Sequence, residues 1–115
     1  MKKLKTQTTY ERLMADPKFK KDYDIECKNG IREARNNIEY CDDMIFSIIA
    51  SRMEEARIIG EYKQALDIPI YDDKQNIKIQ KRIMKLVKHY KVNPELMSRI
   101  YTLIIEESIK IQGEI

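Results

Sequence analysis

The stretch that decides the fold is residues 31–66, IREARNNIEYCDDMIFSIIASRMEEARIIGEYKQAL, which no proline interrupts. Its apolar residues recur in steps of three and four, which is the period of one helix face. This stripe consists of Ile31, Ala34, Ile38, Cys41, Ile45, Ile48, Ala56 and Ile59. With a rise of about 1.5 Å per residue, one helix here would be about 50 Å long. A helix of that length cannot bury its stripe within a small monomer, so we expect a second copy of the chain to cover it.

A break follows at Asp67–Asp73, where Pro69 favours an extended loop. Asp72 or Asp73 is available as the N-cap of a second helix, which we expect to reach about Lys91. The apolar residues on the inner face of this helix are Ile79, Ile83, Leu86, Val87 and Tyr90.

Asn93-Pro94-Glu95 is a start signal for a third helix, with a capping residue before a proline. Its helical period is carried by Leu96, Ile100, Leu103, Ile104 and Ile111. The sequence therefore predicts an all-α fold, a three-helix unit in which the first helix is much the longest.

The first 30 residues predict a short helical extension. Thr8-Thr-Tyr-Glu11 has the spacing of a capping box, and Asp16-Pro17 is a second helix start. Asn29-Gly30 is typical of a turn and is expected to end this section. We therefore expect an extension over residues 1–30 and the main helical domain over residues 31–115.

The composition of the 115 residues excludes several classes of protein. Hydrophobic residues make up 43%, which is too many for a disordered chain, and 3 Gly and 3 Pro are too few for a many-stranded barrel. The net charge of +3 is too small for the dense basic face that nucleic acid usually requires. We expect no nucleic-acid partner.

Membrane insertion and secretion are not expected either. The longest uncharged stretch, Met44–Ser51, is far shorter than the roughly 20 residues of a membrane span. Met1-Lys-Lys-Leu-Lys starts like a signal peptide, but no apolar run follows it. Cys27 and Cys41 have no metal-ligand spacing. These features predict a cytoplasmic protein.

Two cations lie on the apolar stripe of the long helix. Arg52 falls between Ile48 and Ala56, and Lys63 follows Ile59 by four residues. They are about three turns and 16 Å apart, so they point the same way. Because a buried cation without counter-charge is costly, each either pairs with an acid or binds an anion.

Arg35 adjoins the same stripe at a distance of about 25 Å from Arg52 along the helix axis. Two arginines so far apart cannot hold one small molecule. If Arg35 serves a site of this kind, that site must belong to another protomer.

Ser108 and Gln112 share one face of the third helix, and without further information an exposed helix end explains them. The sequence has no catalytic triad, glycine-rich phosphate loop or zinc spacing. Hydrolytic and nucleotide chemistry therefore have no support.

Four segments, taken in order, resemble the all-helical (AroQ-type) chorismate mutases. They are Arg35, Arg52-Met-Glu-Glu-Ala-Arg-Ile-Ile-Gly-Glu-Tyr-Lys63, Pro69-Ile-Tyr-Asp72 and Ile104-Ile-Glu-Glu-Ser108-Ile-Lys-Ile-Gln112. The resemblance covers roughly residues 30–113. It implies an intertwined homodimer with two equivalent active sites, each built from both chains.

The resemblance also implies an activity. Chorismate, a dicarboxylate, would rearrange to prephenate in one concerted step toward phenylalanine and tyrosine, with no cofactor or metal. Arg52 and Arg35 of the second copy would bind the carboxylates, and Ser108 would add a hydrogen bond. Lys63 and Gln112 would donate to the ether oxygen, where negative charge grows. The implied substrate-binding residues are Arg35, Arg52, Lys63, Asp72, Asn76, Ser108 and Gln112.

The sequence departs from the family pattern at Gln75-Asn76, where an Arg-Glu pair is usual. Asn76 can still accept a hydrogen bond from the ring hydroxyl, but more weakly, by about 1 kcal/mol. The change keeps two alternatives open: an isochorismate-pyruvate lyase on the same fold, and a non-catalytic helical dimer.

Overall fold

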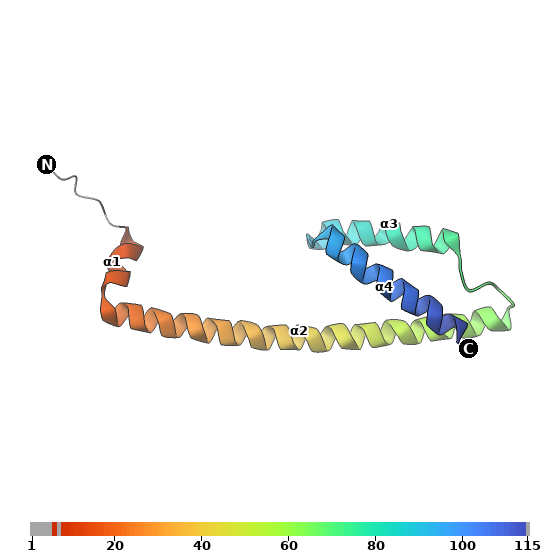
Figure 1. Ribbon diagram of the computed structural model, residues 1–115, viewed down its shortest axis with the longest axis horizontal. Helices are drawn as coiled ribbons and strands as arrows, with labels where there is room; N and C mark the ends of the chain where they lie inside the picture. The colour runs from red at the N-terminus through yellow and green to blue at the C-terminus, as the bar shows by residue number, and fades with distance from the viewer. Residues whose placement is uncertain (1–5, 7, 115) are drawn as a thin grey trace. The chain divides into compact units, whose positions relative to one another are not determined.

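The computed structural model describes Thr6 and residues 8–114. This part of the chain contains helices and no strands (Figure 1), which confirms the all-α prediction. The helices are α1 (Thr9–Ala15), α2 (Pro17–Ala65), α3 (Asp73–Tyr90) and α4 (Pro94–Gly113). The chain divides into two compact units, Met1–Ile45 and Phe46–Ile115.

In the first unit, α1 begins with the predicted capping box. The Thr8 hydroxyl oxygen accepts a hydrogen bond from the Glu11 backbone N–H at 3.1 Å, and the Thr8 N–H donates to the Glu11 carboxylate at 3.2 Å. Aromatic rings join α1 to the start of α2. Tyr10 meets Tyr23 edge-on with ring centroids 6.4 Å apart, and Phe19 stacks on Tyr23 at 6.2 Å.

The long helix α2 begins at Pro17, where only a short separate helix was predicted, and not at Ile31. At this start the Asp16 carboxylate accepts from the Lys18 N–H at 3.0 Å. The turn predicted at Asn29-Gly30 is wrong, because α2 continues through both residues. Gly30 does not have a positive φ, and the Asn29 side chain accepts from the Arg32 guanidinium at 2.8 Å along the helix surface. A glycine inside a helix costs about 1 kcal/mol against alanine, which a long cooperative helix tolerates.

The second unit begins its chain reversal at the end of α2. Asp67 adopts a left-handed backbone conformation with φ 56°, and the Ile68 N–H donates to the Lys63 carbonyl at 2.8 Å. This arrangement ends the helix in the manner of a Schellman motif. Pro69 follows in the connection to α3, as predicted.

Both predicted caps of the later helices are confirmed. The Asp72 carboxylate accepts from the Gln75 N–H at 3.2 Å, and the Asn93 side chain accepts from the Leu96 N–H at 2.9 Å. Lys91, with φ 54°, ends α3 in the left-handed region. In Figure 1, α4 runs from the end of α3 back to the C-terminal part of α2, where Ser108 contacts Arg52.

Few side chains are buried within one chain. The buried residues of the helices are the small Ala56, Gly60 and Ser108. Five residues of the predicted apolar faces of α3 and α4 are exposed, namely Leu86, Tyr90, Leu96, Ile100 and Leu103. The stripe of α2 is open as well, and Ile48, for example, is 65% exposed. The helices thus present apolar faces that one chain alone does not cover.

None of the helices, over the residues described, has an apolar segment that would suffice to cross a membrane.

Candidate active site

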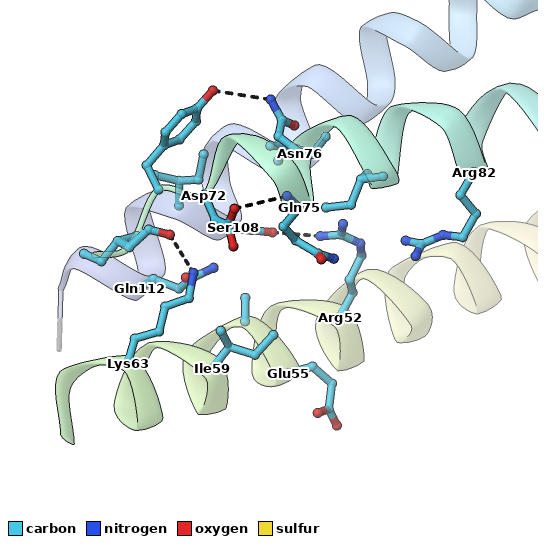
Figure 2. A pocket seen from close by; sticks show the side chains of 16 residues that line it. Arg52, Glu55, Ile59, Lys63, Asp72, Gln75, Asn76, Arg82, Ser108 and Gln112 are labelled. Atoms are coloured by element: carbon cyan, nitrogen blue, oxygen red, sulfur yellow. Dashed lines mark hydrogen bonds between the residues drawn. The ribbon is translucent and has the colours of Figure 1, made fainter. Parts of the chain in front are cut away.

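A pocket of about 250 Å³ lies among α2, α3 and α4 in the second unit (Figure 2). This volume is slightly below the usual range of about 300–1,000 Å³ for small-molecule sites. The pocket is lined by all the predicted site residues of this unit, which are Arg52, Lys63, Asp72, Asn76, Ser108 and Gln112. Arg35 belongs to the first unit and does not line it.

Arg52 is half-buried and is held from two sides. Its guanidinium donates to the Ser108 hydroxyl oxygen at 2.8 Å and lies 6.0 Å from the centroid of the Tyr101 ring. Ser108 in turn donates to the Ile104 carbonyl at 2.8 Å. Since Ser108 is only 7% exposed, its interpretation as part of an exposed helix end is wrong.

Lys63 is also half-buried, near the other end of the pocket. Its ammonium donates to the Ile70 carbonyl at 2.6 Å, which ties the end of α2 to the loop before α3. An ammonium has three N–H donors, so two remain for a ligand.

Among the residues that the structure describes, the pocket cations have no carboxylate partner. Within the described residues, the ion pairs are exposed ones, joining Arg57 to Glu54 and Glu61, and Arg99 to Glu95. Two half-buried cations without acids favour the anion-binding alternative, because desolvating them uncompensated is costly.

Two amide oxygens in the pocket lack hydrogen bonds. Asn76 Oδ1 and Gln112 Oε1 are buried, and within the described residues neither has a partner. The Asn76 amide nitrogen makes a long contact of 3.5 Å to the Tyr71 hydroxyl. An unpaired buried acceptor costs about 1–3 kcal/mol, so a ligand that donates to these oxygens would bind favourably.

The walls between these polar groups are apolar. They are formed by Ala56, Ile59, Ile79, Ile105 and Ile109. Such walls make the pocket less polar than bulk water, which strengthens the interactions of the charges at either end with a ligand.

Residues 34–113 match the family described as chorismate mutase type II. The chain belongs to this family. A chorismate mutase from Methanocaldococcus jannaschii is 33% identical over 84 residues, which cover 73% of this chain and 85% of that protein. The family inferred from the ordered cations and polar residues is thereby confirmed, and it makes the chain an isomerase of the chorismate mutase class.

The family match begins at residue 34, so it includes Arg35 and leaves the whole N-terminal extension, residues 1–30, outside. Within the match, the pocket has polar residues that the sequence analysis did not assign to the site, chiefly Arg82 and Tyr71. Arg82 follows Ile79 by three residues and so shares its face of α3, but on a helix that also carries several lysines this spacing alone does not single it out.

The residues of the pocket are suited to a chorismate mutase that holds and orients its substrate through charges and hydrogen bonds. Its cations and amides can hold an anion and donate hydrogen bonds, and the Ser108 hydroxyl is engaged with Ile104 and Arg52. In the part of the chain that the structure describes, no group of three His, Cys, Asp or Glu side chains converges as a metal site would require.

Proposed function

We propose that this chain converts chorismate to prephenate in the pocket of the second unit, without a cofactor. The observation that supports this most strongly is the pair of half-buried cations, Arg52 and Lys63. They face one apolar-walled pocket and have no carboxylate partner in the described part of the chain. A dicarboxylate supplies the missing negative charge. The relative from Methanocaldococcus jannaschii is itself named a chorismate mutase.

In this proposal Arg52 binds a carboxylate of the substrate through its planar fork of N–H groups. Ser108 holds that guanidinium in place at 2.8 Å, in addition to any contact of its own with the substrate. Holding the flexible enolpyruvyl arm over the ring raises the population of the reactive conformer.

Lys63 and Gln112 are proposed to donate to the ether oxygen as the C–O bond breaks. Negative charge on this oxygen is largest in the transition state, so donors fixed near it lower the barrier more than they strengthen substrate binding. The bond from Lys63 to the Ile70 carbonyl keeps the ammonium oriented before substrate arrives. Gln112 is uncharged and donates without having to be protonated.

Asn76 is proposed to accept a hydrogen bond from the ring hydroxyl. Its Oδ1 atom is buried and unpartnered within the described residues, as such an acceptor would be before ligand binds. Asp72 completes the proposed substrate-binding set from the N-cap of α3.

We also propose a homodimer in which each site takes Arg35 from the second copy. One helix, α2, carries Arg35 and Arg52, and the apolar residues along it are exposed in the single chain. A second copy laid along α2 would cover them. Residues 1–30 are proposed to be an extension to a catalytic domain formed by residues 31–115.

The pathway and the cellular location of the protein are proposed from the reaction. Prephenate leads to phenylalanine and tyrosine, a biosynthesis that we place in the cytoplasm. Nucleic acid and membranes are not proposed as partners.

A second candidate is an isochorismate-pyruvate lyase, because Gln75 and Asn76 both line the pocket. Neither carries a charge, so the region that senses the ring hydroxyl differs from the usual Arg-Glu pair. An altered contact to that hydroxyl could change which isomer is accepted.

The test is to give chorismate and isochorismate separately to the purified protein and to identify the products. We expect chorismate to be lost and prephenate to form. Pyruvate released from isochorismate, with chorismate unchanged, would favour the lyase. If neither substrate reacts, the protein is a non-catalytic member of the family.

A further inference from the structure

Arg82, on α3, is a third cation that lines the pocket. Figure 2 shows its side chain extending from α3 toward the side of the pocket that holds the Arg52 guanidinium. We propose that Arg82 is a substrate-binding residue, which contacts a carboxylate of the dicarboxylate substrate together with Arg52. This inference rests on the proposed function and names a residue beyond those already assigned to it.

The position of Arg82 follows from the geometry of α3. Gln75, Ile79 and Arg82 are spaced by four and three residues, so they share one helix face, and all three line the pocket. Arg82 lies about two turns, or 10 Å, beyond Gln75. The positive charge that α3 contributes is therefore near Arg52 rather than near the Asp72 cap.

Arg82 is exposed in the single chain, and the described residues around it provide no counter-ion. No ion pair of Arg82 occurs within the described residues. The pocket has two carboxylates: Asp72 caps α3, and Glu55 is directed away from the pocket in Figure 2. The two guanidiniums of Arg52 and Arg82 repel each other when they are directed to one region. A carboxylate bound between them is attracted to both and offsets that repulsion.

The other cations of α3 do not share this position. The lysines of α3, which are Lys74, Lys78, Lys81, Lys85 and Lys88, do not line the pocket. Lys81 precedes Arg82 directly and therefore points to a different side of the helix. It provides a matched control, since its replacement removes the same charge from the same turn.

The experiment compares Arg82→Gln, Arg82→Lys and Lys81→Gln with the parent protein in chorismate kinetics. Loss of one charge-assisted contact is expected to raise KM about tenfold in Arg82→Gln, with a smaller change in kcat. Arg82→Lys keeps the charge but loses the planar fork, so its KM should be intermediate. Lys81→Gln should stay within about twofold of the parent.

The outcomes separate this inference from the proposed function. If the parent is active and Arg82→Gln keeps the parental KM, Arg82 does not bind substrate and the proposed function stands. If Arg82→Gln keeps the parental KM but its dimer dissociates more readily in sedimentation, Arg82 forms an ion pair with an acidic residue of the second copy. That result would overturn the inference.

If the parent does not turn over chorismate, the proposed function fails, and calorimetry with prephenate tests Arg82 alone. A dissociation constant about tenfold weaker in Arg82→Gln would support the inference. Equal affinity, or no binding by the parent, would overturn it.

Discussion

Arg52 and Lys63 lie on a helix face that is otherwise apolar, and each is held by a neutral oxygen rather than by a carboxylate. Arg52 donates to Ser108 at 2.8 Å and Lys63 to the Ile70 carbonyl at 2.6 Å. Neutral acceptors fix the direction of a cation without neutralising it. Both residues are thereby oriented for an anion, which is the basis of the proposed catalysis.

Replacing either cation with alanine should therefore abolish most turnover. We expect Arg52→Ala and Lys63→Ala to lower kcat/KM by at least about 100-fold, since each removes a donor aimed at substrate charge. Circular dichroism should show parental helix content, because neither residue belongs to an ion pair of the described chain.

Arg57→Ala is the control on the same helix, because Arg57 lies outside the pocket and pairs with Glu54 and Glu61. Near-parental turnover by Arg52→Ala or Lys63→Ala would show that the proposed site is not where the reaction occurs.

The sequence predicted that Arg52 and Lys63 share a face of the helix, because the helical period determines the direction in which each side chain points. It did not show that the Asn76 and Gln112 oxygens would be buried and unpaired, since burial depends on how three helices meet. Arg82 was missed for a related reason. On a helix rich in lysine, one further cation does not stand out in the sequence. Only the packing of α3 against the other helices shows that the face carrying Arg82 lines the pocket.

At the scale of the helices, Asp72 has two functions in one side chain. Its carboxylate caps α3 by accepting from the Gln75 N–H, and it also lines the pocket. The cap fixes where α3 begins, and therefore where Asn76 lies relative to Lys63.

We expect Asp72→Ala to lower the free energy of unfolding by about 1 kcal/mol, because a helix N-cap is lost. Asparagine caps nearly as well as aspartate, so Asp72→Asn should restore both stability and KM. Urea unfolding at one fixed protein concentration, with chorismate kinetics, measures the two effects. An Asn variant as impaired as the Ala variant would instead mean that the negative charge itself is required.

The exposed surface of α2 has a pH-dependent ion pair. A hydrogen bond from Arg57 lowers the pKa of Glu54 below its ordinary value. A lowered carboxyl pKa contributes stability that is present above the unfolded-state pKa and is lost as the pH falls through the folded-state pKa. Because the pair is exposed, its contribution to stability should be small.

A carbon-detected NMR titration should therefore place the pKa of Glu54 below that of an ordinary glutamate. In Arg57→Gln it should rise toward the ordinary value, and activity should not change. A Glu54 titration that is identical in the two proteins would contradict the assigned cause.

The helix starts could largely be predicted from capping residues in the sequence. Thr8, Asp16, Asp72 and Asn93 each precede a helix as capping residues and were predicted to do so. The error at Asn29-Gly30 arose because a turn-forming dipeptide is a local preference, and a long helix on both sides outweighs it.

At the scale of the whole molecule, the exposed apolar residues are the main feature that one chain leaves unexplained. Ile38, Ile45 and Ile48 on α2 are each more than half exposed. Helical period predicted this stripe, and the length of the helix predicted that it needs a partner. The exposure of Leu86 and Leu103 was not predictable, because their cover depends on contacts that period alone does not specify.

A site shared by two chains is the central claim, and subunit mixing tests it most directly. Arg35→Ala and Arg52→Ala homodimers should both be inactive. In a heterodimer, one site would receive the intact Arg52 of one chain and the intact Arg35 of the other, so equal mixing should restore about a quarter of parental turnover. Native mass spectrometry would verify the exchange. No recovery in a mixture with proven heterodimers would contradict the shared site.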